Sequence, residues 1–210
     1  IHGADRFLLT RNVKKLFAQS KTIQARLQRW GGIPSEVLYP PPPQRAYRCE
    51  EYGDFIFAVS RLTKLKRFDM LVRAMARAEA GQTRAIIAGD GEARGDLEAL
   101  ARELGIDHRV RLVGEVSPDQ LVDYLARCRA VCFPAFNEDF GFVTVEAFAS
   151  GKPVVTCTDS GGPAELVRDG VEGYVTAPNG RRSATLSPAS PTTSCWHASW
   201  APTPGRPCLR

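Results

Sequence analysis

The chain has 210 residues, of which 43% are hydrophobic and 24% charged, a composition typical of a globular protein that buries a core. The apolar runs stay well short of the roughly 18 residues that a membrane-spanning helix needs, and the first residues lack the charged-then-apolar pattern of a secretory leader. A net charge of +5 suits nucleic acid, an anionic membrane or a phosphorylated ligand. Since the basic residues gather only in "RLTKLKR" (61–67), we favour a phosphate-bearing small ligand, although a solvated basic surface would carry the same residues.

The first 50 residues differ from the rest. "KKLFAQSKTIQARLQRWGG" (14–32) predicts a strand, a helix and a stop at glycine, and "SEVLYPPPP" (35–43) predicts a strand that ends at four prolines. Four consecutive prolines form a stiff, extended connector. Because the chain does not begin with methionine, we expect residues 1–34 to be the remnant of a preceding domain. Residues 35–54 would then form a strand and a Pro-rich connector into the main domain.

From residue 55 onward, short apolar runs alternate with helical patterns. The apolar runs are FIFAVS (55–60), RAIIAG (84–89), RVRLVG (109–114), AVCFPA (130–135), PVVTCT (153–158) and EGYVTA (172–177). The helical patterns are FDMLVRAMARAEA (68–80), DLEALARELG (96–105), SPDQLVDYLARC (117–128), FVTVEAFASG (142–151) and GPAELVRDG (162–170). In the first helical pattern the apolar residues recur at the spacing of an amphipathic helix.

The apolar runs predict a parallel sheet. Strands that are apolar throughout, rather than alternating, are typical of sheets covered by helices on both faces. The alternation of strands and helices therefore predicts an α/β fold, a doubly wound, Rossmann-like parallel sheet over residues 55–179. In such sheets, ligands bind outside the carboxyl ends of the strands, so we expect the functional residues in the loops that follow them.

Six cysteines lie at positions 49, 128, 132, 157, 195 and 208, and no two of them form a CxxC pair. We therefore expect buried, reduced thiols and a cytoplasmic protein. Zinc ligands and disulfides are the less favoured alternatives.

The composition changes abruptly at about Gly180. Residues 180–210 contain no Asp, Glu or Lys, are dense in Ser, Pro and Thr, and show no usable periodicity. Disordered segments usually keep acidic residues and avoid tryptophan, which occurs twice here. We therefore treat residues 180–210 as an atypical tail, disordered or frame-shifted, and assign it no function.

Basic residues and glycines follow the first two predicted strands. Arg61 and Lys66 come after FIFAVS, and an arginine fork together with a lysine point charge suits a diphosphate. Gly89 ends RAIIAG and Gly91 follows two residues later, and together they predict a tight turn. Glycine either lets the backbone approach a ligand or merely makes the turn, and the sequence leaves both explanations open.

The stretch NEDFGFVTVEAFASG (137–151) follows the fourth predicted strand. Gly141 permits a sharp turn, and a helix begins near Phe142, whose first-turn N–H groups favour an anion such as phosphate. Glu138 precedes the turn and Glu146 lies in the helix. Carboxylates are acceptors only, so both suit the hydroxyls of a ribose or a hexose. Alternatively, one is a solvated helix residue and the other a partner of the helix dipole.

In combination, these features resemble the carboxyl-terminal domain of retaining glycosyltransferases of family 4, which have the GT-B fold. The E-x7-E pattern of that family is matched by Glu138 and Glu146. Its donor-phosphate pattern, RL followed by Lys, is matched by Arg61 and Lys66. The segments 86–128 and 158–175 are also similar, so the resemblance spans about residues 36–179. One departure is Arg67, where many relatives carry glycine.

The resemblance implies transfer of a hexose from a UDP- or GDP-linked donor to an acceptor, with retention. By matching position, Arg61 and Lys66 would hold the diphosphate, and Glu138 would contact the transferred sugar. The implied catalytic residues are Arg61, Lys66 and Glu138. The implied donor-binding residues are Arg61, Lys66, Val113 beside the base, Glu138, Phe140, Gly141 and Phe142 by their backbone, and Glu146 on the ribose.

The resemblance also implies what the chain lacks and where it works. Family members need no bound metal, in keeping with the missing DxD-like motif, so we expect no cofactor. The acceptor, a glycan or a lipid-linked sugar, would be held mainly by an amino-terminal domain that is almost wholly absent. We therefore expect a fragment that is inactive alone and has no nucleic-acid partner. The parent would be cytoplasmic, with peripheral association at the inner face of the membrane as an option.

Three other interpretations compete with this one. A nucleotide-sugar epimerase of the same architecture would lack the E-x7-E spacing. An NAD-binding oxidoreductase would need GxGxxG after its first strand, which the sequence does not contain. The third is a non-catalytic or misfolded truncated fragment that at most binds nucleotide.

Overall fold

The computed structural model describes residues 7–9, 11, 13–77 and 80–178. Its main part is a six-stranded sheet in the order β5-β4-β3-β6-β7-β8. The strands are β3 (Phe55–Val59), β4 (Arg84–Ala88), β5 (Val110–Gly114), β6 (Ala130–Cys132), β7 (Val154–Cys157) and β8 (Gly173–Thr176). All of their pairings are parallel, which confirms the predicted α/β fold class and puts the carboxyl ends along one edge.

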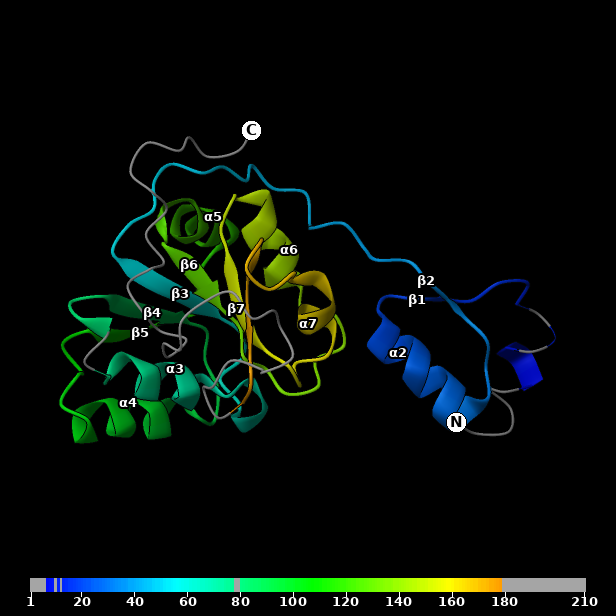
Figure 1. Cartoon of the computed structure of the whole chain (residues 1–210), viewed down its shortest axis with the longest axis horizontal. Coiled ribbons are helices and arrows are strands. Elements are labelled where there is room, and N and C mark those ends of the chain that lie inside the picture. Colours follow the sequence, from blue (N-terminus) through cyan, green and yellow to red (C-terminus); the bar gives the residue numbers. More distant parts are fainter. Residues whose placement is uncertain (1–6, 10, 12, 78–79, 179–210) are drawn as a thin grey trace.

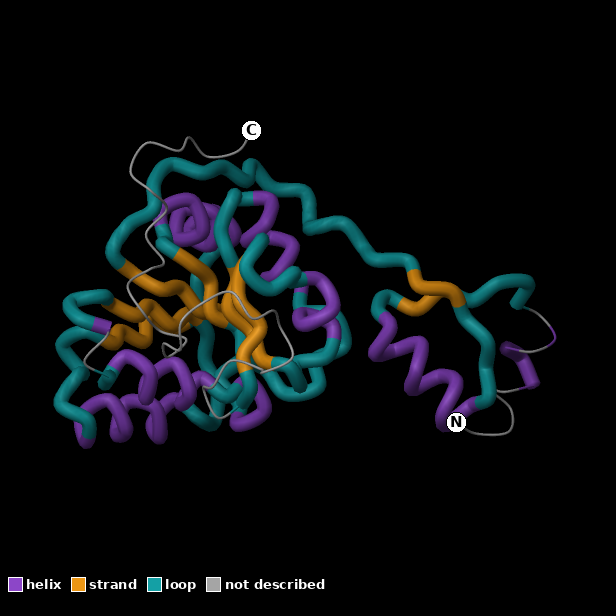
Figure 2. Tube along the Cα trace, in the orientation of Figure 1, coloured by secondary structure: helices purple, strands orange, loops and turns teal. Residues whose placement is uncertain are grey.

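Helices cover both faces of this sheet (Figure 1). α3 (Phe68–Met75) and α4 (Arg94–Glu103) lie on one face. α5 (Pro118–Arg127), α6 (Phe142–Ala149) and the short α7 (Gly162–Leu166) lie on the other side. Figure 2 shows the strands as the central layer between these helices. The sheet is therefore doubly wound, as the sequence predicts.

Local interactions explain where several elements begin and end. Ser117 caps α5, because its side chain accepts from the N–H of Gln120 while the Gln120 side chain accepts from the N–H of Ser117. β6 ends before Pro134, which has no N–H to donate to a neighbouring strand. α3 ends at Met75, earlier than predicted.

The core lies between the sheet and the helices. Phe57 and Leu125 are completely buried, and the ring of Phe57 stacks on that of Tyr124 with centroids 5.0 Å apart. Leu71 and Val72 of α3 and Ile87 of β4 are also completely buried. The amphipathic pattern of residues 68–80 thus identifies the buried face of α3 correctly.

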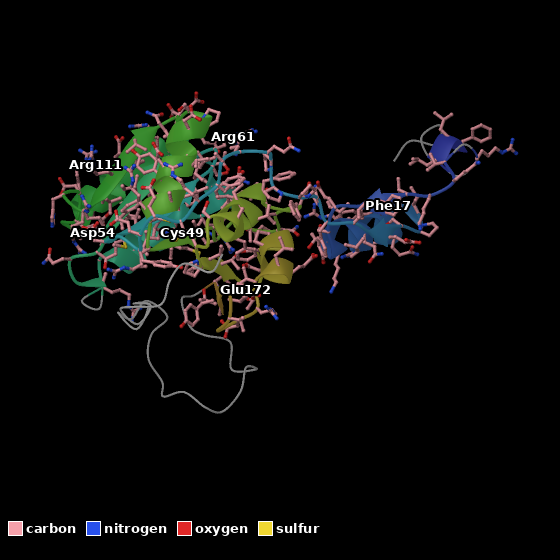
Figure 3. All side chains as sticks on the ribbon, turned by 90° about the horizontal axis from the view of Figure 1, so that it is seen from above. Phe17, Cys49, Asp54, Arg61, Arg111 and Glu172 are labelled. Carbon is pink, nitrogen blue, oxygen red and sulfur yellow. The ribbon has the colours of Figure 1, made fainter. Side chains whose placement is uncertain are left out.

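A smaller unit precedes the main domain. β1 (Phe17–Ala18) and β2 (Glu36–Val37) pair in parallel around α2 (Lys21–Arg26) and a π-helix, η1 (Leu27–Gly31). Ser20 caps α2, and Gly32 ends η1 at a φ of 59°. The predicted strand, helix and glycine stop are therefore present. Phe17 belongs to this unit and lies well away from Arg61 of the main domain (Figure 3).

Residues 38–54, which we call the connector, join β2 to β3 and include the four prolines at 40–43. β2 pairs with β1, so its hydrogen bonds group it with the smaller unit rather than with the connector. The tail at 180–210 lies outside the described residues, and its character stays a prediction.

Of the four cysteines that the structure describes, three follow expectation and one does not, whereas Cys195 and Cys208 lie outside the described residues. Cys128, Cys132 and Cys157 are buried free thiols, and burial raises the pKa of Cys128 to about 12. Cys49 is disulfide-bonded, which corrects the expectation of reduced thiols. Among the helices of the described residues, none is long and apolar enough to cross a membrane.

Gly89 and Gly91 are required by packing. A Cβ atom on Gly89 would lie 1.9 Å from the carbonyl oxygen of Ser60, and one on Gly91 would lie 2.5 Å from that of Leu62. Both glycines also have positive φ angles, of 115° and 150°. The close approach of the loop after β3 therefore accounts for this turn without a ligand.

Replacing Gly89 with alanine should lower the free energy of unfolding by at least about 2 kcal/mol, because backbone must shift to admit the new methyl group. Gly95 of α4 is the matched control, since a Cβ atom there meets nothing within 4 Å. Gly95→Ala should instead stabilise by up to about 1 kcal/mol through helix propensity. Urea unfolding of both variants measures the difference, and equal effects would contradict the packing explanation.

Candidate functional site

The order of the strands reverses between β3 and β6. From β3 the chain continues to β4 and β5 on one side of the sheet, and it then returns to β6 on the other side. At such a point the two following loops diverge and leave a crevice outside the carboxyl ends. The loop after β3 carries Arg61 and Lys66, and the loop after β6 carries Glu138. The predicted residues therefore lie at the place where parallel sheets bind ligands.

Lys66 and Glu138 form an ion pair across this crevice. Nζ of Lys66 donates to Oε2 of Glu138, although the two residues are 72 positions apart in sequence. Their side chains are 19% and 24% exposed, so the pair is shielded in part but remains accessible. Nζ of Lys66 also lies 5.5 Å from the centroid of the Phe133 ring. One basic and one acidic residue of the predicted set thus come together.

A hollow of about 620 Å³ surrounds the ion pair. Its charged lining residues are Arg61, Lys64, Lys66, Glu92, Glu138 and Asp139. Arg61 is exposed, and its side chain forms no ion pair or hydrogen bond with any residue that the structure describes. An unpaired guanidinium offers several N–H donors in a fixed geometry, so Arg61 is available to an anion that enters the hollow.

The turn before α6 is tightly packed. Gly141 has a φ of 75°, and a Cβ atom there would lie 2.7 Å from Cγ of Pro163 and 2.8 Å from Cε1 of Phe133. Phe140 is 2% exposed and Phe142 is 44% exposed, and their rings meet edge to face. α6 begins at Phe142 without a side-chain cap, so its first N–H groups are not used by a capping side chain. This arrangement can hold an anion at the start of α6.

The loop after β7 fixes the backbone of Glu138. The N–H of Glu138 donates to the carbonyl of Ser160 at 2.9 Å, and the N–H of Gly162 donates to the carbonyl of Glu138 at 2.9 Å. A Cβ atom on Gly161 would lie 2.5 Å from that same carbonyl oxygen. Gly161 and Gly162 therefore let the two loops approach, and the position of Glu138 depends on them.

Glu146 lies outside the hollow. It is 6% exposed, and Oε1 of its carboxylate accepts from Nη1 of Arg45 and, at 3.0 Å, from the hydroxyl of Tyr47. Both partners come from the connector. The structure therefore does not bring Glu146 into contact with Lys66 or Glu138, and its nearest charge is an arginine that sequence reasoning missed.

Val113 is also separate from the hollow. It lies in β5, which β4 and β3 separate from β6 in the sheet, and it packs in part against the core. Gly114, next to it, has a φ of 76° and accepts a hydrogen bond from the N–H of Gly89 at 2.6 Å. Among the predicted residues, Arg61, Lys66 and Glu138 line the hollow. The others do not: Val113, Phe140, Gly141, Phe142 and Glu146.

Arg67 connects three loops. Nε donates to the carbonyl of Pro134 at 2.7 Å, and the two terminal nitrogens donate to the two carboxylate oxygens of Asp159 at 2.8 and 2.6 Å. Arg67 has a φ of 51°, a backbone conformation that glycine adopts without strain. Arg67 follows Lys66 in sequence and binds the two loops on either side of Glu138. It therefore helps to hold the backbone of Lys66 and the backbone of Glu138 in position relative to each other. The sequence identifies Arg67 only as a departure from the family pattern.

The smaller unit reaches the rim of the hollow through α2. Arg26 donates to Oδ1 of Asp139 and, at 2.7 Å, to the carbonyl of Asn137. The first N–H groups of α2 donate to the carboxylate of Glu165 in α7 at 2.8 and 2.7 Å. Both residues that flank Glu138 are thus held by Arg26. Sequence reasoning missed this contact, because no local pattern relates residues 113 positions apart.

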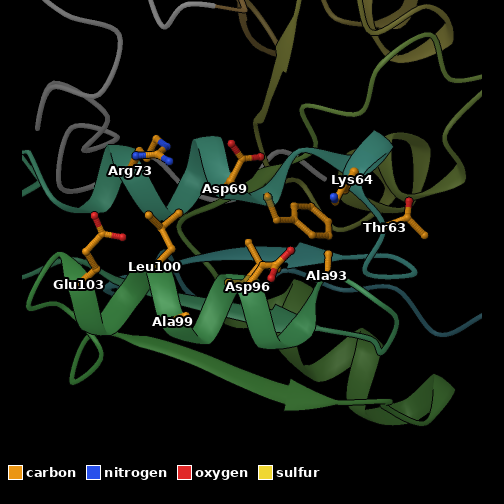
Figure 4. Close-up of a pocket in the computed structure, with 11 residues that line it drawn as sticks. Thr63, Lys64, Asp69, Arg73, Ala93, Asp96, Ala99, Leu100 and Glu103 are labelled. Carbon is orange, nitrogen blue, oxygen red and sulfur yellow. The ribbon is translucent and has the colours of Figure 1, made fainter.

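A second hollow, of about 500 Å³, lies between α3 and α4 (Figure 4). Asp69 and Arg73 of α3 face Asp96 and Glu103 of α4 across it. None of the predicted residues line it, and its charged residues include both acidic and basic side chains from two surface helices. Within the described ranges, no group of three or more His, Cys, Asp or Glu residues could hold a metal ion. The hollow at the strand ends is therefore the candidate site.

Replacing Arg67 with glycine should reduce the free energy of unfolding by about 1.5–3 kcal/mol at pH 7, the range for hydrogen bonds to a charged partner. Glycine accepts the positive φ, so the loss reports the side chain rather than backbone strain. The hydrogen bond from Arg67 lowers the pKa of Asp159 below its ordinary value of 3.8. The stabilisation is therefore complete above pH 3.8 and disappears as the pH falls through the folded-state pKa.

Urea unfolding at pH 7 and in acid measures this effect. The wild type and Arg67→Gly should differ most at pH 7, and in acid the difference should shrink to the part that comes from the hydrogen bond to the carbonyl of Pro134. Asp159→Asn should differ from the wild type at pH 7 and converge with it in acid. A difference between wild type and variant that stayed constant with pH would contradict the role of the Arg67–Asp159 pair.

Comparison with known proteins identifies the family. Residues 45–186 match the family described as glycosyl transferases group 1. The chain is 35% identical over 131 residues to an uncharacterized glycosyltransferase of Methanocaldococcus jannaschii, with 62% of this chain and 33% of that protein covered. It is 38% identical over 150 residues to a D-inositol 3-phosphate glycosyltransferase of Nocardia farcinica, with 65% of this chain and 33% of that protein covered.

Solved structures show the same fold. Anabaena Alr3699/HepE in complex with UDP and glucose superposes with a TM-score of 0.72 at 27% identity, over 83% of this chain and 52% of that one. The chain thus spans about a third of the length of the curated relatives and about half of this solved structure. The Rossmann-like parallel sheet matches that of GT-B glycosyltransferases. On this evidence the chain belongs to the group 1 glycosyl transferases.

Proposed function

We propose that this chain is the donor-binding half of a hexosyltransferase of family 4. The parent enzyme would transfer a hexose from a UDP- or GDP-linked donor to a glycan or a lipid-linked sugar, with retention at the anomeric carbon. The observation that carries the proposal is the meeting of Lys66 and Glu138 beside the unpaired Arg61, in the crevice where the strand order reverses. The complex of the Anabaena relative with UDP and glucose supports the class of donor.

The charges of the hollow suit a diphosphate. Lys66 and Glu138 neutralise each other in the free protein, whereas Arg61 carries a charge without a partner among the described residues. An incoming diphosphate would bind Arg61 and compete with Glu138 for Lys66. Glu138, released from Lys66, would then accept from hydroxyls of the transferred sugar. The two cations would stabilise the charge that develops on the leaving diphosphate.

The turn before α6 would complete the donor site. The backbone of Phe140, Gly141 and Phe142 lies at the start of a helix whose dipole favours an anion, so it would approach phosphate and sugar. Glu146 would hold the ribose, and Val113 would border the base. Because side-chain cations neutralise the diphosphate, this mechanism requires no cofactor.

The acceptor and the location of the parent belong to the part of the enzyme that this chain does not span. An acceptor would enter between this half and an amino-terminal domain. The parent would act in the cytoplasm, with peripheral membrane association if its acceptor is lipid-linked. A non-catalytic or misfolded fragment and a GT-B epimerase remain the alternatives to be tested.

Nucleotide binding tests the site. Thermal denaturation with UDP, GDP and ADP should show base-selective stabilisation, of about 2.7 kcal/mol at a ligand concentration one hundred times the Kd. Arg61→Ala and Lys66→Ala should each weaken binding about tenfold or more, since each removes a charged donor to phosphate. Arg73→Ala is the control, because Arg73 lines the other hollow. No stabilisation by any nucleotide, or equal loss in the control, would contradict the assignment.

An assay of sugar transfer tests whether this half binds the donor while the other half binds the acceptor. The isolated chain should bind donor yet transfer no sugar from UDP- or GDP-hexoses to glycan acceptors, because the acceptor side of the cleft is missing. A radiolabelled donor measures transfer and slow donor hydrolysis together. Sustained turnover by this chain alone would show that the acceptor site lies within it.

A further inference from the structure

Two residues of the connector bind the same oxygen of Glu146. Nη1 of Arg45 and, at 3.0 Å, the hydroxyl of Tyr47 both donate to Oε1. None of the hydrogen bonds among the described residues involves Oε2 of Glu146. Among the described residues, the side-chain polar atoms that are fully buried without a partner are the hydroxyls of Ser35, Thr144 and Ser150, and Oε2 is not one of them. Oε2 therefore reaches the surface and is left for another donor.

We propose that Arg45 and Tyr47 are positioning residues for Glu146. They hold Oε1 and thereby present Oε2 to a ribose hydroxyl, so that the site selects nucleotides with an intact ribose over their deoxy counterparts. The inference rests on the proposed function, in which Glu146 contacts the ribose.

The chemistry of the three side chains supports this role. A carboxylate turns about its last bond unless donors fix it, and two donors on one oxygen set the direction of the other. Burial and the hydrogen bond to Glu146 raise the pKa of Tyr47, so its hydroxyl stays protonated and donates. Glu146 has a 7% exposed side chain, and a carboxylate this buried is stable only beside a cation such as Arg45.

The connector is anchored on both sides of Arg45. Before it, the ring of Tyr39 stacks on Phe140 with centroids 6.3 Å apart. After it, the hydroxyl of Tyr52 donates to the carbonyl of Gly151 at 2.8 Å. The four prolines stiffen the segment between Tyr39 and Arg45. Arg45 is thus held against Glu146 by its surroundings, which suits a fixed support better than a side chain that swings aside.

Isothermal titration of the whole chain with UDP and with 2′,3′-dideoxy-UDP tests the proposal, with GDP and its dideoxy form in parallel. The wild type should bind the ribonucleotide at least about tenfold more tightly, as expected for a hydrogen bond to a charged group. Arg45→Ala and Glu146→Gln should reduce this preference to about twofold or less. Tyr47→Phe removes one hydroxyl with little effect on packing and should give an intermediate preference.

Arg48→Ala is the matched control. Arg48 lies on the same connector and also binds carboxylates, those of Glu50 and Asp123, but it does not contact Glu146. It should keep the full preference for ribose. Circular dichroism of each variant separates loss of fold from loss of selectivity.

The outcomes distinguish this inference from the proposed function. A wild type that binds no nucleotide overturns the proposed function, and one that binds without preferring ribose overturns the role of Glu146 alone. If the wild type prefers ribose and Arg45→Ala keeps that preference, the positioning role is wrong. Tighter binding by Arg45→Ala would show instead that Arg45 competes with the nucleotide for Glu146, which also overturns the proposal.

Discussion

The short pairing between β3 and β6 is the constraint on which the rest of the site depends. These strands are joined only through Ile56 with Ala130 and Phe57 with Val131, and they then separate. The backbone of the loop after β6 must find other partners, since buried N–H groups are costly to leave unpaired. Phe136 donates to Leu65 of the loop after β3, and Asn137 and Glu138 donate to Asp159 and Ser160 of the loop after β7. The crevice therefore has rigid walls although it lies between loops.

Paired charges hold these walls in place. Lys66 with Glu138 and Arg67 with Asp159 each join segments of these walls that lie far apart in sequence, and Arg45 with Glu146 does the same outside the hollow. Such half-buried groups lose hydration, and only a close partner of opposite sign compensates for that loss. Arg61 and Lys64 of the same hollow are exposed and form no ion pair with the described residues, so their side chains keep their hydration. The paired charges of the crevice therefore nearly cancel, and the unpaired basic side chains at its opening leave a positive charge there.

The sequence predicts the architecture well because its signals are local. Apolar runs identify all six strands, and Ser117 identifies the start of α5. The rule that parallel strands present their carboxyl ends at one edge was enough to bring Lys66 and Glu138 together. Arg45 and Arg67 could not be found in the same way, since their partners lie 101 and 92 positions away. Glu146 was identified by its spacing, but spacing gives no direction for a side chain, and the helix turns it toward the connector.

The prolines at 40–43 have a consequence for how the two sheets form. A run of prolines has no N–H groups and cannot add to the edge of a sheet. The β1-β2 pair and the six-stranded sheet are both parallel, and both present strand edges that an ordinary linker could join. Because the prolines between the two sheets have no N–H groups, the linker cannot pair with either edge as an extra strand. Each sheet can therefore pack against its own helices before the two units come into contact.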